Sequence, residues 1–333
     1  MPESTPQRRL RILSGMQPDG RMHLGNYLGA LRNWVNLQDE YDCVYTIVDY
    51  HALTTVTNPA TIRPAISEMM LDWLAAGLDP ERSIIFVQSD VPEVTELHLL
   101  FSMTTPVSWL ERVPTFKERV EQFPENVNYG LLGYPVLQAA DILLYQGDRV
   151  PVGEDQVPHI ELTREIARRF NHHYGPVFVE PQVLLTDTPR IMGTDGTSKM
   201  SKSRGNVIPM TAEPGEIRRI VSTMVTDVER PRRSDPGHPE KCNVCALHRT
   251  FSPDGWEEIW TGERTARTGC VDVKKQLAEA IAAYFAPMRQ RRAELAARPD
   301  TVWEILAAGA ERARAVARPT LGAAREAMGL LRR

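Results

Sequence analysis

The chain has 333 residues, of which 42% are hydrophobic and 25% are charged, a composition that excludes a wholly disordered protein and allows about two domains. It has four cysteines, no apolar run of the roughly 18 residues that a membrane span needs, and a polar start unlike a signal peptide. We therefore expect a cytoplasmic protein without a disulfide framework or membrane contact. Its net charge is −4, so a nucleic-acid partner would need a local patch of cations.

The first half of the chain alternates short segments rich in β-branched residues with longer segments of helical periodicity. Strands are expected at residues 9–14, 43–49, 83–88 and 149–152. Helices are expected at residues 24–37, 62–76, 137–145 and 158–170. Strands separated by helices predict an α/β fold with a doubly wound parallel sheet, whose ligands bind at the carboxyl ends of the strands.

The second half of the chain predicts helices without strands. These helices are expected at residues 214–225, 272–288 and 307–331. Pro319 interrupts the last of them, and a charged, proline-rich connection covers residues 227–239. We therefore expect an α/β domain over residues 1–205 and an all-helical domain over residues 206–333.

The end of the chain is rich in arginine. From Pro287 onward there are ten arginines, no lysine and five acidic residues, which gives this part a charge of about +5. Two interpretations remain open: a solvated helix face whose charges pair with one another, or a surface that binds a polyanion. Arginine suits the second interpretation, because its planar fork pairs with phosphate and stacks on unpaired bases.

A glycine-containing segment joins the first strand to the first helix, at residues 14–26 (SGMQPDGRMHLGN). Gly15 and Gly20 permit a tight turn, and Gly25 lets a bulky ligand lie against the start of the helix. Amides at a helix N-terminus favour anions, so phosphate is the natural ligand. The segment is neither a Walker A loop nor a GxGxxG motif, and taken alone it also fits an ordinary strand-to-helix turn.

A second segment, residues 196–206 (GTSKMSKSRGN), combines two lysines, three serines and flanking glycines. Such a cationic, hydroxyl-rich loop can close over a polyphosphate and stabilise the charge that grows in a transition state. A solvated surface loop is the alternative.

Together the two segments resemble the signatures of the class I aminoacyl-tRNA synthetases. Residues 23–26 match the His-Ile-Gly-His signature with Asn26 in place of the last histidine, and residues 199–203 match Lys-Met-Ser-Lys-Ser without change. Residues 14–31, 48–52, 134–145 and 150–156 resemble the bacterial tryptophanyl enzymes in particular. The resemblance implies a Rossmann-like catalytic domain, a homodimer, and a helical domain that binds the tRNA anticodon, with its last helix packing back on the catalytic domain. The arginine-rich tail and residues 230–233 are the expected tRNA contacts.

The resemblance also implies which residues contact ATP and its Mg²⁺. They are Gln17, Pro18, Asp19, His23, Gly25, Asn26, Gly153, Glu154, Asp155, Ile191, Lys199, Met200, Ser201, Lys202 and Ser203. Four of these are expected to be catalytic: Gln17, Lys199, Ser201 and Lys202.

A carboxylate in an apolar run suggests how the amino acid is recognised. An indole offers an N–H donor and no acceptor, so Asp141, which lies among apolar residues where an unpaired charge would be costly, is the candidate acceptor. The resemblance implies that Val48, His51, Tyr134, Gln138, Val150, Val152 and Gln156 line the same pocket. Some relatives carry Met at the position of Gln138.

The implied reaction has two steps, with L-tryptophan, ATP and tRNA(Trp) as substrates. The tryptophan carboxylate attacks the α-phosphate of ATP, giving an adenylate and pyrophosphate, and the acyl group then moves to the terminal ribose of the tRNA. A carboxylate is already ionised at neutral pH, so the first step needs no general base. Catalysis then depends on positioning and on stabilising charge.

The cysteines of the helical half are weighed separately. Some relatives hold an iron–sulfur cluster with four cysteines, and two of those positions match Cys242 and Cys270. The other two are Glu263 and Val273 here, whereas a cluster normally needs four soft ligands. A zinc site would use Cys242, Cys245, His248 and Cys270. We expect no metal, with zinc and iron–sulfur as alternatives.

Two other functions remain open. A tyrosyl-tRNA synthetase of the same subclass would need a pocket that both donates to and accepts from a phenol, and the apolar surroundings of Asp141 favour an indole. A non-catalytic paralogue that only binds tRNA or protein would have no need of intact Lys199, Ser201 and Lys202.

Overall fold

The computed structural model describes residues 8–122, 124–185 and 191–331. A parallel sheet with the strand order β3-β2-β1-β4-β5 forms its centre. The strands are β1 (Arg11–Met16), β2 (Asp42–Ile47), β3 (Ser83–Val87), β4 (Arg149–Val152) and β5 (Gln182–Leu185). Strands β2 and β3 are added on one side of β1, and β4 and β5 on the other. Open α/β sheets bind ligands at such a change in strand order, here outside the carboxyl ends of β1 and β4.

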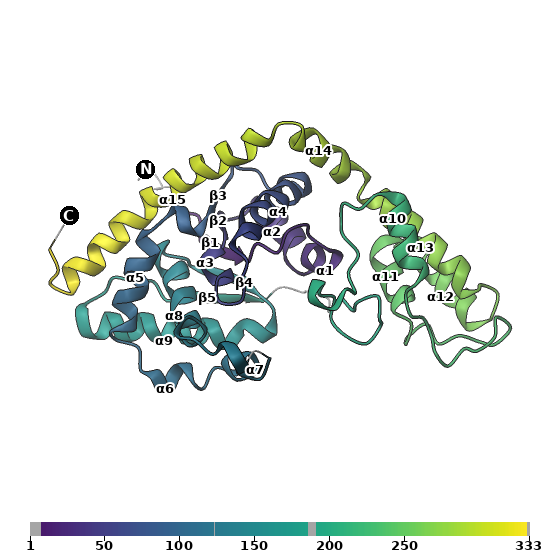
Figure 1. Cartoon of the computed structure of the whole chain (residues 1–333), viewed down its shortest axis with the longest axis horizontal. Coiled ribbons are helices and arrows are strands. Elements are labelled where there is room, and N and C mark those ends of the chain that lie inside the picture. Colours follow the sequence, from purple (N-terminus) through teal and green to yellow (C-terminus); the bar gives the residue numbers. More distant parts are fainter. Residues whose placement is uncertain (1–7, 123, 186–190, 332–333) are drawn as a thin grey trace, which may run out of the picture.

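Helices connect these strands and cover both faces of the sheet (Figure 1). They are α1 (Leu24–Asn26), η1 (Tyr27–Leu31), α2 (Arg32–Leu37), α3 (Asp49–Ala52), η2 (Pro59–Thr61), α4 (Ile62–Ala76), η3 (Gln88–Asp90), α5 (Glu93–Ser102), α6 (Val107–Leu110), α7 (Pro114–Gln122), η4 (Pro124–Asn126), α8 (Tyr129–Leu144), η5 (Glu154–Gln156) and α9 (Val157–Tyr174). The turn η1 is π-helical and joins α1 and α2 into one helical run.

Side chains that alternate along β2 supply two hydrophobic clusters, one on each face of the sheet. Tyr45 and Ile47 belong to the cluster that includes α4 and the helical half, whereas Val44 belongs to the cluster that includes α5, α8 and α9. Burial on both faces explains why β2 and β3 read as nearly continuous apolar segments. The expected α/β fold with a doubly wound parallel sheet is confirmed.

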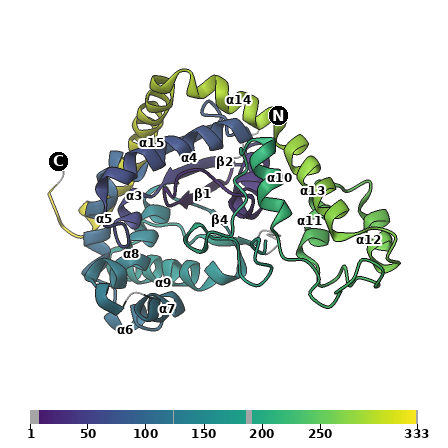
Figure 2. The same ribbon diagram turned by 45° about the vertical axis from the view of Figure 1, so that its right-hand side comes forward.

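Residues 191–331 contain helices and no strand. They are η6 (Lys202–Arg204), α10 (Pro214–Ser222), α11 (Asn243–Phe251), α12 (Trp256–Arg264), α13 (Cys270–Tyr284), α14 (Ala286–Ala296) and α15 (Pro299–Ala327). Helices α10 to α13 form a group at one end of the molecule, away from the sheet (Figures 1 and 2). No helix among residues 8–122, 124–185 and 191–331 has both the length and the apolarity to cross a bilayer.

The last helix returns to the sheet. Helix α15 packs on β3 and also meets α4, α5 and α8. The approach is closest at Gly309, where a Cβ atom would lie 1.8 Å from the carbonyl oxygen of Ile85. Pro319 lies inside α15 and does not end it, so the expected interruption is wrong. The helix continues through the proline, which removes one backbone hydrogen bond.

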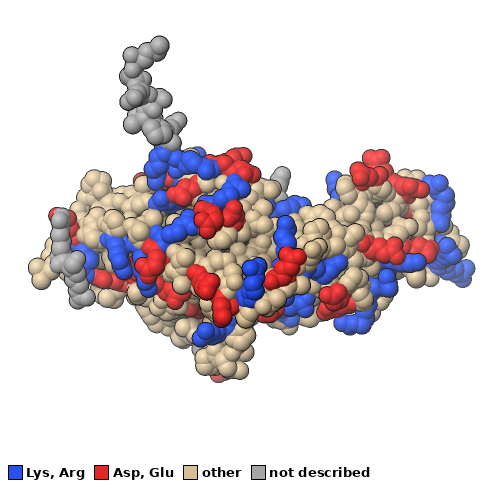
Figure 3. Space-filling model, turned by 90° about the horizontal axis from the view of Figure 1, so that it is seen from above, with Lys and Arg blue, Asp and Glu red and all other residues tan. Residues whose placement is uncertain are grey.

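Arginines of the tail attach this helix to the first half of the chain. Arg318 Nε lies 3.0 Å from Glu93 Oε1, Arg325 pairs with Glu96, and Arg312 donates to the Ser83 carbonyl at 3.2 Å. On the face seen from above, cationic and acidic side chains are interspersed (Figure 3). The structure therefore favours the interpretation in which the tail charges pair within the protein, mostly between elements rather than within one helix.

Candidate active site

A cavity of about 270 Å³ lies at the carboxyl ends of β1 and β4. Its walls come from these two strand ends, from α2, from the segment after β2, and from α8. The lining includes every residue that the sequence placed around the amino acid: Val48, His51, Tyr134, Gln138, Asp141, Val150, Val152 and Gln156. The structure thus brings together residues that lie more than a hundred positions apart, in a space of the size that a small ligand occupies.

Several buried polar side chains form a hydrogen-bonded cluster beside this cavity. Asp141, 4% exposed, accepts from Gln88 Nε2 at 2.8 and 2.9 Å, one contact to each carboxylate oxygen. His51 Nε2 lies 2.9 Å from Asp141 Oδ2, and because a carboxylate only accepts, this nitrogen carries the proton. Gln88 Oε1 in turn accepts from the Tyr50 amide at 3.1 Å.

Gln88 is absent from the residues that the sequence analysis selected. A signal was present, because Gln88 is a polar residue directly after the buried strand β3, at the edge of the sheet where ligands bind. Its pairing with Asp141 joins segments 53 positions apart and could not be inferred from spacing.

The first signature caps the helix that follows β1. His23 is the N-cap of α1: its Nδ1 accepts from the Asn26 amide at 3.3 Å, and Asn26 Oδ1 accepts from the His23 amide at 3.2 Å. Burial first, and then the nearby charges of Lys202 and Lys199, lower the pKa of His23 to about 4. The imidazole is therefore neutral at physiological pH, which lets Nδ1 act as the acceptor in this cap.

The two signatures meet in space. Lys202 Nζ contacts the carbonyl oxygen of Asp19 and lies 3.3 Å from its carboxylate. A Cβ atom on Gly25 would lie 3.0 Å from the His23 ring and 3.4 Å from Met200 Cβ, so only glycine leaves the two segments this close. Met200 is buried, and its amide donates to the Ile191 carbonyl at 3.1 Å.

The other residues that were expected to contact ATP differ in position and burial. Gly153 lines the amino-acid cavity, whereas Glu154 and Asp155 are exposed in η5. Lys199 is exposed, and Ser201 shares a hydrogen bond of 3.0 Å with Ser203. The other members of the first loop differ in burial: Pro18 is buried, Gln17 half-buried and Asp19 exposed.

The cysteines of the helical half do not fit a zinc site. His248, a required ligand, has both ring nitrogens engaged: Nδ1 lies 2.9 Å from Ser252 Oγ and Nε2 lies 3.0 Å from the Val273 carbonyl. Cys242 is the N-cap of α11. Hydrogen bonds from the Cys245 thiol and from backbone amides lower the pKa of Cys242 to about 7.

An arginine side chain lies where the candidate iron–sulfur ligands converge. Arg230 Nη1 lies 2.8 Å from Glu263 Oε2 and 3.9 Å from Cys270 Sγ, and both members of the ion pair are 1% exposed. A buried guanidinium is a cation already present among these groups, so they do not favour a metal cluster. Because Arg230 is enclosed in this pair, its expected role as a tRNA contact is wrong.

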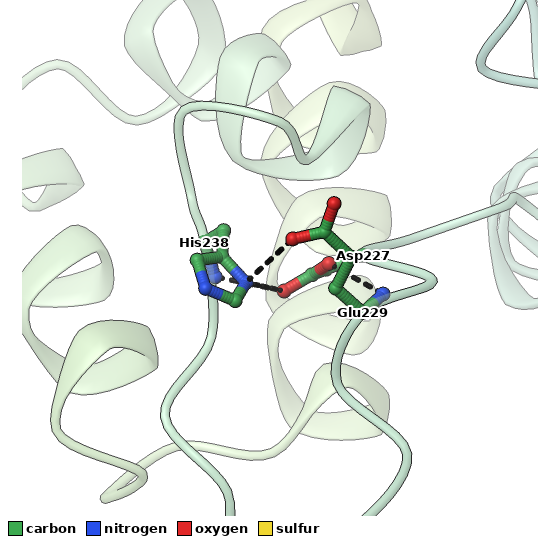
Figure 4. Close-up of side chains that lie close together, drawn as sticks. All are labelled: Asp227, Glu229 and His238. Atoms are coloured by element: carbon green, nitrogen blue, oxygen red, sulfur yellow. Dashed lines mark hydrogen bonds and ion pairs between the residues drawn. The ribbon is translucent and has the colours of Figure 1, made fainter.

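A different group, Asp227, Glu229 and His238, has ligand atoms within 4.8 Å of one another (Figure 4). His238 Nδ1 lies 2.9 Å from Asp227 Oδ2, and the amides of His238 and Glu229 also donate to Asp227, at 2.8 and 2.9 Å. Lys241 Nζ is 2.7 Å from both oxygens of Glu229. These contacts already give all three side chains polar partners within the protein, so the geometry does not require a bound ion.

Comparisons with known proteins agree with this geometry. The family model of class I tRNA synthetases (W and Y) matches residues 5–286. A tryptophan–tRNA ligase of Thermotoga maritima is 47% identical over 97% of this chain and 100% of its own length, and one of Deinococcus radiodurans is 45% identical over 97% and 99%. The crystal structure of a Campylobacter jejuni tryptophanyl-tRNA synthetase complexed with ADP and tryptophan superposes with a TM-score of 0.88, at 34% identity over 96% of this chain and 100% of that one.

Proposed function

The chain belongs to the class I tRNA synthetases of the tryptophan and tyrosine group and catalyses the tryptophan–tRNA ligase reaction. From this premise we propose which of its residues serve each step of the reaction. The enzyme activates L-tryptophan with ATP to tryptophanyl-adenylate and pyrophosphate, and then transfers tryptophan to the 3′-terminal ribose of tRNA(Trp). The observation that carries this assignment is near-complete coverage of tryptophan enzymes at 41–47% identity.

Tryptophan selection is assigned to the cavity between β1 and β4. Asp141 accepts the indole N–H; its carboxylate has about four acceptor positions, of which Gln88 and His51 occupy part. Tyr134 packs edge-on against the His51 ring, with centroids 4.3 Å apart, and supplies an aromatic wall. Val48 and Val150 make the neighbouring lining apolar, which suits an indole better than a phenol.

ATP is assigned to the place where the two signatures meet. The substrate carboxylate attacks the α-phosphate without a general base, so the protein contributes orientation and positive charge. Lys199 and Lys202 carry that charge toward the departing pyrophosphate, and His23, which is neutral beside them, adds no further charge. Mg²⁺ adds positive charge when it accompanies ATP; it takes most of its ligands from phosphates and water, so it needs no all-protein cage.

The tRNA anticodon end is assigned to the group α10 to α13, within the proposed helical domain of residues 206–333. Exposed cations there include Arg218, Arg219, Arg232, Arg264, Arg267 and Lys275. The distance of this group from the sheet in Figure 1 supports a separate contact with the tRNA, while α15 belongs with the catalytic domain by packing. A role in charging tRNA implies a cytoplasmic location.

A homodimer is assigned to the surface formed by α3, α5, α6 and α8. Exposed apolar side chains gather on these neighbouring elements and the turns that join them: Leu53, Leu99, Met103, Val107, Val127 and Tyr129. Contacts between α5 and α8, including the ring contact of His98 with Tyr129, support their forming one surface. Apolar groups gathered in this way are typical of protein interfaces.

Amino-acid-dependent ATP–pyrophosphate exchange tests the function and the pocket together, because it needs no tRNA. We expect exchange with tryptophan and little with tyrosine. Asp141→Ala should lower kcat/KM for tryptophan by about 10- to 100-fold, since losing a partner for a buried donor costs roughly 1–3 kcal/mol. Asp254→Ala, an exposed aspartate in the helical half, is the matched control and should behave as wild type.

Faster exchange with tyrosine would make the chain a tyrosyl enzyme. Absence of exchange with both amino acids would favour a binding paralogue. Unchanged kinetics in Asp141→Ala would remove this residue from the pocket.

A further inference from the structure

The segment that carries the two signature lysines is folded around the side chain of Asp195. Asp195 Oδ1 accepts from the amides of Thr197 and Ser198 at 3.0 and 3.1 Å. Its Oδ2 accepts from Ser198 Oγ at 2.6 Å and from Asn206 Nδ2 at 2.8 Å. These hydrogen bonds, the Ser198 hydroxyl first, hold the pKa of the Asp195 carboxyl well below its usual range, so it accepts throughout the working pH.

Asn206 closes the segment from its other end. The residue is 3% exposed, and its Oδ1 accepts from the Ser201 amide at 2.7 Å. Its Nδ2 also lies 2.9 Å from Ser198 Oγ and 3.3 Å from the Lys199 carbonyl. One amide side chain therefore holds the backbone on both sides of Met200, between the two lysines.

The side chain of Asn206 packs tightly against the backbone at Gly193. A Cβ atom on Gly193 would lie 2.1 Å from Asn206 Nδ2, so that position accepts only glycine while Asn206 is in place. Backbone hydrogen bonds run from Gly193 to the Ser198 carbonyl at 2.7 Å and from Thr194 to the Asn206 carbonyl at 2.9 Å. The two ends of the segment are thus tied directly to each other.

The base of this structure is attached to the helical half of the chain. The amide of Val225, after α10, donates to the Thr194 carbonyl at 2.9 Å. Asn243, the first residue of α11, donates from Nδ2 to the Gly193 carbonyl at 2.8 Å. The segment therefore starts from a fixed point on packed helices rather than from a free loop.

We propose that Asp195 and Asn206 are positioning residues for adenylate formation, which act by holding Lys199 and Lys202 where pyrophosphate charge develops. Neither residue needs to touch the substrates. The lysines provide the charge, and the hydrogen-bonded pair fixes the backbone from which their side chains extend. Because flexible lysine side chains lose much entropy when they are localised, a fixed starting point raises the fraction of molecules with both ammonium groups in place. This inference rests on the proposed role of the lysines.

The test is a double-mutant cycle between Asn206→Ala and Lys202→Ala, read by the single-turnover rate of adenylate formation. Asn206→Ala alone should slow this rate by about 10- to 100-fold, the size of effect that misplacement of reacting groups produces. The tryptophan dissociation constant without ATP should stay within about twofold, because the amino-acid cavity is separate from this segment. In the Lys202→Ala background, the same change should slow the rate by clearly less than it does in the wild type, because one of the two groups being positioned is gone.

Thr197→Ala is the matched control, since its exposed side chain changes while the amide that donates to Asp195 remains. It should keep the wild-type rate. Asp195→Asn is the second variant: it keeps the size of the side chain but weakens its acceptors, and it should slow adenylate formation with the same dependence on Lys202.

Additive effects of Asn206→Ala and Lys202→Ala, or equal losses in tryptophan binding and in rate, would overturn the proposal. If Asn206→Ala lowers the melting temperature strongly, Asp195→Asn decides the matter by the same cycle. A wild-type enzyme that forms no adenylate would instead overturn the proposed function, so the two failures are distinguishable.

Discussion

At the scale of single residues, the site depends on which groups are kept neutral and which remain charged. His23 is enclosed at the start of α1 near Lys199 and Lys202, so protonating it would place a third positive charge in the proposed phosphate site. Its lowered pKa, about 4, prevents this above roughly pH 5. The ionised Asp195 lies in the same segment as the lysines, where hydrogen bonds rather than a cation satisfy it. Positive charge thus remains concentrated on the two lysines.

The stability of the protein should therefore depend on pH through His23. Its pKa is 6.5 in the unfolded chain and about 4 in the folded one, so between these values the unfolded state binds the extra proton. The unfolding free energy should fall as the pH falls from 6.5 to 4, by at most about 3 kcal/mol from this group. Urea unfolding of wild type and His23→Gln at pH 7 and 4.5, at one protein concentration, measures it. The variant should lose less stability, and equal losses in both proteins would contradict the assignment.

At the scale of elements, the backbone of helix α15 lies very close to the backbone of strand β3. Gly309 brings the helix directly onto the β3 backbone at Ile85, and two arginines that follow it in the helix bind the first residue of β3 and a glutamate of α5. A buried carboxylate, Asp72 of α4, links three further segments: it accepts from the Met22 amide at 2.7 Å, from Thr211 Oγ1 at 3.0 Å and from Arg292 Nε at 2.8 Å. The first signature, the start of the helical half and α14 are therefore attached to one side chain.

Two glycines of α15 provide a matched pair for testing this packing. Gly309→Ala should destabilise the protein by on the order of 3 kcal/mol, because the new methyl group would overlap the Ile85 carbonyl and must separate helix from strand. Gly322→Ala, in the same helix with nothing within 4 Å, should instead stabilise it by about 0.5–1 kcal/mol through helix propensity. Thermal and urea unfolding measure both. Similar effects from the two substitutions would show that α15 does not rest on β3 in solution.

At the scale of the whole molecule, different surfaces serve different contacts. The arginine-rich tail, which the sequence left open as a polyanion site, contributes to attachment of α14 and α15. The exposed cations of α10 to α13, which we propose as the tRNA contacts, lie at the end of the molecule away from the sheet in Figure 1. The exposed apolar side chains on α5, α6, α8 and the turns beside them lie in the catalytic half.

A charge placed on that apolar surface should separate the proposed dimer. Met103 is 69% exposed, and Met103→Glu should shift the mass measured by light scattering at micromolar concentration from two chains to one, since burying an unpaired carboxylate is costly. Val271, 79% exposed on α13, is outside this surface, so Val271→Glu should remain dimeric. A wild-type protein with the mass of one chain, or a Met103→Glu variant that stays dimeric, would contradict the proposed interface.

The sequence by itself determined the features that arise from local chemistry. Apolar periodicity and β-branched runs located β1 to β4 within a few residues and gave α4 its observed bounds, since such patterns report which faces are buried. It missed β5, a four-residue edge strand that is half-exposed, and the helices α5 to α7. The signature lysines and Asp141 were also readable, because a cationic serine-rich loop and a carboxylate among apolar residues are unusual along one chain.

Only the tertiary structure decided which groups face one another. Gln88 reaches Asp141 across 53 positions, Arg318 reaches Glu93 across 225, and Arg230 is enclosed with Glu263, and in each case a polar side chain finds its partner through the fold rather than through spacing. An arginine-rich tail has the same amino-acid composition whether its arginines bind phosphate or a neighbouring helix. Long-range packing selects between these outcomes, because a buried or half-buried charge is stable only beside the partner that the fold supplies.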